Sequence, residues 1–220
     1  MKITYYFGVM SSNKTLNLLT MSYNYKQRGK KPVIIRPKLD TRTSEVKSRV
    51  GLSEAADFTI KSDIDEKLVR NIVQTAKLQS GIILVDEAQF MSSEFISLLS
   101  SYARQYDVNI FAFGLLKDFR NKLFDGAKKW IEEADSLREV KTICEKCNRK
   151  ATCNALENKN RVMVRDTFDK NNNNVVIGDS LFHVYCELHW HEKYNHDKKI
   201  ILDTLWKDSY YVMTKWWVVH

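Results

Sequence analysis

The sequence lacks any run of apolar residues long enough to cross a membrane. A spanning helix needs about 20 such residues, and no stretch of the 220-residue chain approaches that length. The N-terminal Met-Lys-Ile-Thr also lacks the apolar core of a secretory signal peptide. We therefore expect a cytoplasmic protein without a membrane partner, made of one large domain or of one domain with a smaller companion.

Cysteine is scarce, and the positive charge is dispersed along the chain. The chain has four cysteines, which in a reducing compartment are metal ligands or thiols more often than disulfides. The formal net charge is +8, but the lysines are spread along the chain. This spread indicates a solvated basic surface rather than a nucleic-acid-binding patch, so we expect no nucleic-acid partner.

Strand-like and helix-like segments alternate over the first 120 residues. Apolar runs typical of buried strands occupy residues 3–7, 32–36, 82–85 and 109–113. Apolar residues at helical spacing follow the first run, precede the third and separate the third from the fourth. The polar stretch 37–51 indicates a loop. This alternation predicts an α/β fold, a P-loop NTPase-like parallel sheet flanked by helices.

The loop after the first apolar run has the spacing of a phosphate-binding loop. Residues 8–15 read Gly-Val-Met-Ser-Ser-Asn-Lys-Thr, against the pattern G-x-x-x-x-G-K-[ST]. Asn13 replaces the second glycine, and asparagine tolerates a positive φ better than other side chains do. The backbone N–H groups and Lys14 would bind phosphates, while the Thr15 hydroxyl would hold Mg²⁺. An ordinary strand-to-helix loop with a polar cap is the alternative.

Two acidic residues, Asp86 and Glu87, directly follow the apolar run 82–85. An aspartate at the carboxyl end of a strand can hold the Mg²⁺ whose other protein ligand is the loop hydroxyl of Thr15. Glu87 could act as a general base. Either motif alone is common, but the two together, in this order, predict a site for a magnesium-bound nucleotide.

A Cys-x-x-Cys pair and a Cys-x-x-His pair form a second constellation. The four residues are Cys144, Cys147, Cys186 and His189. Each pair presents two ligands on a tight turn, and two pairs complete a tetrahedral Zn²⁺ site that has no open position and is therefore structural. Buried cysteines without metal are the alternative. The nearest competing ligands are Cys153, which we take to be a spare thiol, His183 and His191.

The character of the sequence changes near residue 137. Short strand-like segments follow, broken by polar turns, and helical spacing returns after Trp190. We predict three parts: a nucleotide-binding α/β domain (1–136), a small β-rich zinc-binding domain (137–192) and a helical, aromatic tail (193–220). The predicted strands of the small domain are residues 137–142, 161–165 and 175–177. The rings of the tail should pack on this subunit or on a neighbouring one.

Ordered sequence blocks from Thr4 to His189 are similar to those of one family. The blocks are Gly8-x-Met10-x-Ser12-x-Lys14-Thr15, Asp40-x-Arg42, Ser48-Arg49-x-Gly51-Leu52, Asp86-Glu87-x-Gln89-Phe90, Gly114-Leu115, Asp118-Phe119-Arg120, Leu123-Phe124-x-Gly126, residues 137–150, Val175-Val-Ile-Gly178 and Cys186-x-x-His189. With them the chain resembles the cytosolic, zinc-containing (type II) thymidine kinases, whose small domain carries a lasso loop.

The resemblance implies transfer of the ATP γ-phosphoryl group to the 5′-hydroxyl of thymidine, or of deoxyuridine, in pyrimidine deoxynucleotide salvage for DNA synthesis. The implied catalytic residues are Glu87 as base, with Lys14 and Arg42 offsetting phosphate charge. The implied ATP-binding residues are Gly8, Met10, Ser11, Ser12, Asn13, Lys14, Thr15, Asp86 and Gln89. Thr15 and Asp86 would serve Mg²⁺. The cofactors are then ATP, Mg²⁺ and a structural Zn²⁺.

The resemblance also implies which residues bind the nucleoside, and it implies an oligomeric state and an inhibitor. The implied thymidine-binding residues are Met10, Leu115, Phe119, Phe124, Val176, Ile177, Gly178 and Phe182. A homotetramer is expected, as is feedback inhibition by dTTP. The alternative is a catalytically weak, nucleotide-binding relative that acts as an assembly or regulatory module. Such a module has no need of Glu87, whose presence favours the enzyme.

Overall fold

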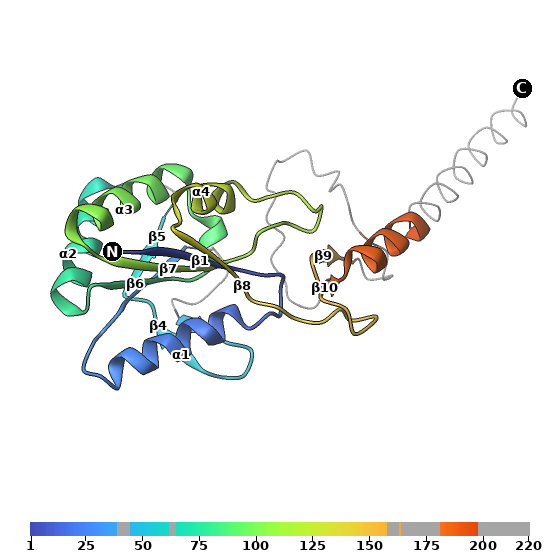
Figure 1. Ribbon diagram of the computed structural model, residues 1–220, viewed down its shortest axis with the longest axis horizontal. Helices are drawn as coiled ribbons and strands as arrows, with labels where there is room; N and C mark the ends of the chain where they lie inside the picture. Colours follow the sequence, from blue (N-terminus) through green and yellow to red (C-terminus); the bar gives the residue numbers. More distant parts are fainter. Residues whose placement is uncertain (39–44, 62–64, 158–162, 164–180, 198–220) are drawn as a thin grey trace, which may run out of the picture. The chain divides into compact units, whose positions relative to one another are not determined.

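The computed structural model describes residues 1–38, 45–61, 65–157, 163 and 181–197. The chain divides into two compact units, Met1–Thr142 and Ile143–His220, which are coloured along the sequence in Figure 1. Among the described residues, no helix is both long and apolar enough to cross a membrane.

A six-stranded sheet forms the centre of the first unit. Its order is β5-β2-β6-β7-β1-β8, and every neighbouring pair is parallel. The strands are β1 (Ile3–Phe7), β2 (Val33–Pro37), β5 (Phe58–Ile60), β6 (Ile82–Val85), β7 (Asn109–Gly114) and β8 (Ser136–Glu139). The predicted α/β fold with a parallel sheet is confirmed.

Helices cover both faces of this sheet (Figure 1). They are α1 (Lys14–Lys26), α2 (Glu66–Gln79), α3 (Ser93–Tyr106) and α4 (Asp125–Glu133). Successive side chains of a strand point to opposite faces. On β6, Ile83 and Val85 therefore pack with α2, α3 and α4, while Ile82 and Leu84 pack on the α1 side. A strand buried on both faces must be apolar throughout, which accounts for the continuous run at 82–85.

Capping side chains mark where two of the helices begin. Asp65 accepts a hydrogen bond from the N–H of Lys67 at the start of α2. Ser92 accepts one from the N–H of Phe95 at the start of α3. These contacts satisfy N–H groups that have no partner within the helix. Both helices lie where the apolar spacing predicts them.

The predicted loop at 37–51 is partly wrong. It contains β3 (Glu45–Lys47), which pairs antiparallel with β4 (Ser53–Ala55). Val46 is fully buried between exposed neighbours, packing in the core cluster that includes Leu18 and Leu19 of α1. One buried side chain in a three-residue strand is too short a pattern to recognise in a polar stretch.

Strand β8 spans the point near residue 137 where the sequence character changes, and it pairs with β1 in the large sheet. The parallel pairing sets Thr4 against Ser136 and Phe7 against Glu139. Three of the four β8 side chains are exposed, as is common on an edge strand.

The second unit contains a two-stranded antiparallel sheet, β9 (Cys153–Leu156) with β10 (Phe182–Tyr185). Residues 187–197 form a helix, in agreement with the helical spacing after Trp190. Of the predicted strand 161–165 only Met163 is described, in an isolated bridge with Glu157. The predicted strand 175–177 and the tail beyond residue 197 lie outside the described residues.

Close backbone contact explains one glycine of the fold. A Cβ atom on Gly126 would lie 2.5 Å from the carbonyl oxygen of Gln89 and 2.6 Å from that of Met91. These oxygens belong to the segment around the short 3₁₀ helix η1 (Ala88–Phe90), on which α4 packs. The indole N–H of Trp130 donates to Ala88 in the same contact.

We predict that Gly126→Ala lowers the free energy of unfolding by about 1–3 kcal/mol, because the added methyl group must push backbone apart. Urea unfolding followed by circular dichroism measures the change. Lys128→Ala, at an exposed position of the same helix, is the control and should change stability by less than about 0.5 kcal/mol. Equal stability of the two variants would contradict the packing argument.

Candidate active site and metal centre

The loop between β1 and α1 is tightly folded. The N–H of Gly8 donates to the carbonyl of Gly114 over 3.3 Å. A Cβ atom at Gly8 would lie 2.4 Å from the carbonyl oxygen of Val140 and 2.6 Å from Ser12 Oγ. Only glycine therefore fits at this position.

Two residues of the loop adopt the left-handed conformation that glycine favours. Asn13 has φ 63° and ψ 26°, as its place in the phosphate-loop pattern leads one to expect. Ser11 has φ 57°, which the pattern does not predict. Side chains rarely take this conformation, so the loop holds backbone strain at both residues.

Lys14 turns back over the loop that precedes it. Its ammonium Nζ donates to the carbonyl of Val9 over 2.6 Å and to Ser12 Oγ over 3.2 Å. Burial lowers the pKa of Lys14 to about 8, and Arg49 adds to this effect, while the carboxylates of Glu87 and Asp86 oppose it. An anion beside the ammonium would offset the cost of burying its charge.

The loop and the acidic pair meet at one edge of the sheet. Thr15 Oγ1 donates to Asp86 Oδ1 over 3.1 Å, across 71 residues of sequence. The carboxyl ends of parallel strands lie at the same edge, which is where α/β proteins place ligands. Burial and the nearby Glu87 raise the pKa of Asp86 to about 7, against the effects of Arg36 and of the Thr15 hydrogen bond. A divalent cation here would favour the ionised carboxylate.

Glu87 has an unusual backbone conformation for its residue type. It lies in the left-handed region with φ 49° and ψ 40°, directly after a buried strand. Gln89 Nε2 donates to Glu87 Oε2 over 2.7 Å, which orients the carboxylate. Strain of this kind persists only where surrounding structure imposes it, and it is common at functional sites.

The amide of Gln89 connects Glu87 to the end of β7. Gln89 is buried, and its Oε1 accepts a hydrogen bond from the N–H of Leu115 over 2.8 Å. The Tyr5 hydroxyl donates to the carbonyl of Leu115 over 2.7 Å. Burial and then the charge of Glu87 raise the pKa of Tyr5, so the phenol stays a donor. The backbone of Leu115 is thus held on both sides.

The predicted nucleoside-binding residues of the first unit lie on neighbouring loops. Met10 is half-buried in the phosphate loop, and Phe119 is buried in the loop after β7. Phe124 contacts Phe90 edge-on, with ring centres 5.4 Å apart.

Phe182 lies on β10 in the second unit, paired with Leu156. Arg42, Val176, Ile177 and Gly178 lie outside the described residues.

One buried cation was not identified from the sequence. Arg36 is 5% exposed near the end of β2. Its positive charge acts against the rise in the pKa of Asp86 that burial and Glu87 cause. Its guanidinium donates to the carbonyl of Glu45. A charged residue at the end of an otherwise buried strand is the signal that could have marked it, because charged side chains are rarely buried without a partner.

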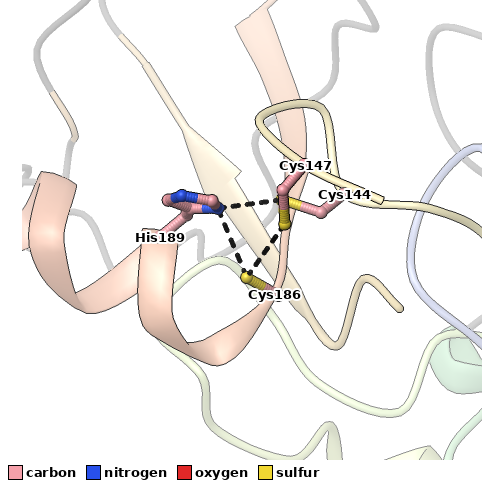
Figure 2. Close-up of side chains that lie close together, drawn as sticks. All are labelled: Cys144, Cys147, Cys186 and His189. Carbon is pink, nitrogen blue, oxygen red and sulfur yellow. Dashed lines mark hydrogen bonds between the residues drawn. The ribbon is translucent and has the colours of Figure 1, made fainter. Parts of the chain in front are cut away.

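The four predicted zinc ligands of the second unit come together (Figure 2). The ligand atoms of Cys144, Cys147, Cys186 and His189 all lie within 4.8 Å of one another. Sγ of Cys147 and Cys186 are 3.9 Å apart, and His189 Nδ1 lies 3.5 Å from Cys144 Sγ and 3.4 Å from Cys186 Sγ. A tetrahedral Zn²⁺ site has edges of about 3.8 Å between sulfurs and about 3.6 Å between sulfur and nitrogen.

The donor chemistry also fits zinc. Burial opposes ionisation of Cys144, but hydrogen bonds from the backbone of Cys186 and Lys146 and from His189 outweigh it and lower its pKa to about 6. Thiolates are the form that binds the metal. The other ring nitrogen of His189 lies 3.8 Å from the Glu192 carboxylate, a common outer partner of a metal-binding histidine. These four residues could hold a structural Zn²⁺.

The competing ligands are engaged elsewhere. Cys153 Sγ donates to Glu187 over 3.2 Å, and His191 pairs with the same carboxylate over 3.1 Å. His183 Nδ1 lies 2.7 Å from Glu145. Among the described residues, the one metal-type cluster contains none of the three. No disulfide joins the four cysteines.

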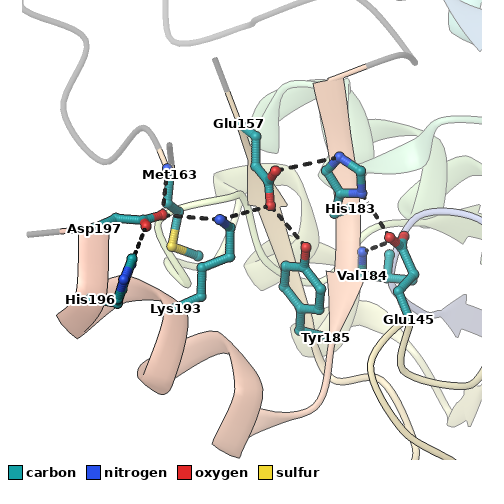
Figure 3. Close-up of polar contacts among 9 residues, drawn as sticks. All are labelled: Glu145, Glu157, Met163, His183, Val184, Tyr185, Lys193, His196 and Asp197. Carbon is teal, nitrogen blue, oxygen red and sulfur yellow. Dashed lines mark hydrogen bonds and ion pairs between the residues drawn. The ribbon is translucent and has the colours of Figure 1, made fainter. Parts of the chain in front are cut away.

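A network of buried carboxylates ties the helix 187–197 to the sheet of this unit (Figure 3). Glu157 accepts a hydrogen bond from the Tyr185 hydroxyl over 2.8 Å, and Asp197 accepts one from the N–H of Met163 over 2.8 Å. Lys193 Nζ lies between them, 3.4 Å from Glu157 and 3.1 Å from Asp197. The buried carboxylates are therefore paired with Lys193, as buried charges generally must be.

The parallel sheet, the loop after β1 and the acidic pair after β6 define the first unit as an α/β protein of the P-loop type. The sequence matches the family model described as thymidine kinase over residues 1–190. The chain belongs to the thymidine kinase family.

Several relatives carry the same description. The thymidine kinase of Enterobacteria phage T4 is 36% identical over 190 residues, covering 84% of this chain and 93% of that protein. The one from Rhodopirellula baltica is 34% identical over 194 residues, covering 87% and 88%. The one from Streptococcus gordonii is 38% identical over 153 residues, covering 69% and 78%.

Among solved structures, the Pif1 helicase from Candida albicans matches 63% of this chain and 36% of its own. The TM-score is 0.41 and the sequence identity 10%. A likeness at this level carries no argument about function.

We predict one zinc ion per chain, measured by elemental analysis of the purified protein. Cys186→Ala should lose the metal and lower the unfolding temperature, because three ligands leave the site incomplete. Cys153→Ala is the matched control and should keep one zinc, since its sulfur contacts Glu187 instead. A metal-free protein, or loss of zinc from the control, would contradict the assigned ligands.

Proposed function

We propose that this protein transfers the γ-phosphoryl group of ATP to the 5′-hydroxyl of thymidine, with deoxyuridine as a second acceptor, in pyrimidine deoxynucleotide salvage for DNA synthesis. The observation that carries the proposal is the hydrogen bond between Thr15 and Asp86. It joins the phosphate loop and the acidic pair at one edge of the sheet, in a chain that belongs to the thymidine kinase family.

The loop supplies the groups that bind a triphosphate. Backbone N–H groups of residues 8–15 and the N-terminal end of α1 favour an anion, and Lys14 adds a cation in a partly buried setting. Thr15 and Asp86 would hold Mg²⁺, which when bound neutralises charge on the phosphates. Such chemistry needs little covalent help from the protein, so positioning and charge stabilisation dominate.

Glu87 is proposed to accept the proton of the thymidine 5′-hydroxyl as that oxygen attacks the γ-phosphorus. The bond between the γ-phosphorus and the bridging oxygen of ADP then breaks. Gln89 holds the Glu87 carboxylate in place. Arg42 is proposed to offset charge on the transferring phosphate.

The base of the nucleoside is proposed to bind against Met10, Leu115, Phe119 and Phe124. Gln89 and Tyr5 fix the backbone of Leu115, which favours a pocket formed in advance. The second unit is proposed to contribute Val176, Ile177 and Gly178 and, from the start of β10, Phe182. Zn²⁺ is proposed as the structural metal of that unit.

The strained backbone of Glu87 supports an enzyme over a weak nucleotide-binding module. A left-handed glutamate costs about 1–3 kcal/mol, and nucleotide binding alone does not need it. Family membership also implies further properties. We propose a cytoplasmic homotetramer with feedback inhibition by dTTP.

We predict that Glu87→Gln lowers kcat for thymidine monophosphate formation by about 10²–10⁴-fold, because the amide cannot accept the proton. Radiolabelled thymidine with Mg-ATP measures turnover, and calorimetry should find ATP affinity within about twofold of the native protein. Glu132→Gln, on the exposed side of α4, is the control for the loss of one carboxylate. Turnover of the Glu87 variant at a tenth of the native rate or more would count against a base at this position.

We predict different outcomes for two changes at Asn13. Asn13→Gly should keep the dissociation constant for ATP within about twofold, because glycine takes the left-handed conformation readily. Asn13→Val should raise it by about tenfold or more, since a β-branched residue resists a positive φ. Calorimetric titration with Mg-ATP measures both. A large gain in turnover for Asn13→Gly would instead mean that the asparagine side chain crowds the phosphates.

A further inference from the structure

The β3–β4 hairpin brings a second cation, Arg49, to the phosphate loop. The Arg49 guanidinium donates to Ser11 Oγ, a contact across 38 residues of sequence. Arg49 belongs to the turn between β3 and β4. Ser11 is one of the two left-handed residues of the loop. The contact therefore joins the hairpin to the strained part of the loop.

The turn that carries Arg49 is closed by its own hydrogen bonds. The N–H of Ser48 donates to the carbonyl of Leu52 over 2.8 Å, and the N–H of Leu52 donates to Ser48 Oγ over 3.1 Å. Ser48 is 5% exposed. Gly51 has φ +90° and donates to the carbonyl of Ser48 over 3.1 Å. These hydrogen bonds constrain the backbone of the turn that carries the exposed Arg49.

The hairpin is also fastened to the helix that begins at the site. Val46 of β3 is fully buried and packs in the core cluster with Leu18 and Leu19 of α1. Ser22 Oγ of the same helix donates to Glu54 of β4 over 2.9 Å. Because α1 also carries Lys14 and Thr15, the hairpin and the phosphate-binding residues share one rigid support.

The placement of two cations at one loop has an electrostatic cost. Arg49 donates to Ser11 Oγ and Lys14 donates to Ser12 Oγ, so the two positive charges lie at adjacent residues of the loop. A multiply charged anion bound at the loop would attract both side chains, and this attraction would offset the repulsion between them. The planar guanidinium also matches two oxygens of a phosphate group, which an ammonium does not.

We propose that Arg49 is a phosphate-binding residue that contacts the polyphosphate of ATP. It exchanges its hydrogen bond to Ser11 for bonds to phosphate oxygens when the nucleotide binds. This assignment deepens the proposed kinase function and rests on it. Ordering of the loop through Ser11 alone, with no contact to phosphate, is the competing explanation.

Calorimetry on the full chain tests the proposal with two probes, Mg-ATP and inorganic tripolyphosphate. Arg49→Gln removes the charge but keeps an amide that can donate to Ser11. We expect its dissociation constants for both probes to rise by about ten- to a hundredfold, because a hydrogen bond to a charged group is lost. Arg49→Lys should recover part of the loss, since it restores the charge without the planar fork.

A matched control separates local from general effects. Arg28→Gln makes the same change in net charge on an exposed arginine beyond the far end of α1, roughly 20 Å from Lys14 at the rise of a helix. It should bind both probes within about twofold of the native protein. Thymidine KM should stay within about twofold in the Arg49 variants, if they retain turnover.

Three results would overturn the proposal. They are unchanged tripolyphosphate affinity in Arg49→Gln, an equal loss in Arg28→Gln, and thymidine and ATP affinities that weaken together. The binding measurements need no turnover. A native chain that binds ATP but forms no thymidine monophosphate would therefore count against the proposed reaction and leave the role of Arg49 to be decided by its own variants.

Discussion

The hydrogen bond between Thr15 and Asp86 is the contact on which the rest of the first unit depends. It requires that β1 and β6 end at the same edge of the sheet, with β7 between them. Parallel pairing meets this requirement, and helices on both faces keep the strands buried. Gln89 and Tyr5 then fix Leu115 at the end of β7. The order of three strands thus sets the geometry of the loop, the acidic pair and the segment that follows β7.

Backbone strain gathers where those strands end. Ser11, Asn13 and Glu87 all adopt left-handed conformations without being glycine. Each costs free energy. Apolar packing on both faces of β6 offsets this cost. Left-handed residues of this kind can turn successive backbone N–H groups towards a common anion. Glu87 follows directly on Asp86, and the Glu87 carboxylate accepts a hydrogen bond from Gln89 while that of Asp86 accepts one from Thr15.

The second unit is stabilised in another way. Its two-stranded sheet and single described helix bury few apolar side chains. A cysteine–histidine cluster with the dimensions of a tetrahedral zinc site joins the turn at 144–147 to the start of the helix. Lys193, between Glu157 and Asp197, joins the later turns of that helix to β9 and to Met163. These contacts add to the small apolar cluster that the described residues of this unit form.

The sequence by itself determined the alternation of strands and helices, the strand–loop–helix context of residues 8–15 and the Cys-x-x-Cys and Cys-x-x-His pairs that cluster, because each of these patterns lies within a few residues. It did not determine the β3–β4 hairpin, the pairing of β8 with β1 or the conformation of Ser11. Nor did it identify Arg36 beside Asp86, or the contact of Arg49 with Ser11. Each of these depends on groups that are far apart in the chain and meet only when the sheet forms. Contacts between residues that are distant in sequence leave no pattern in local spacing, so only the tertiary structure decided them.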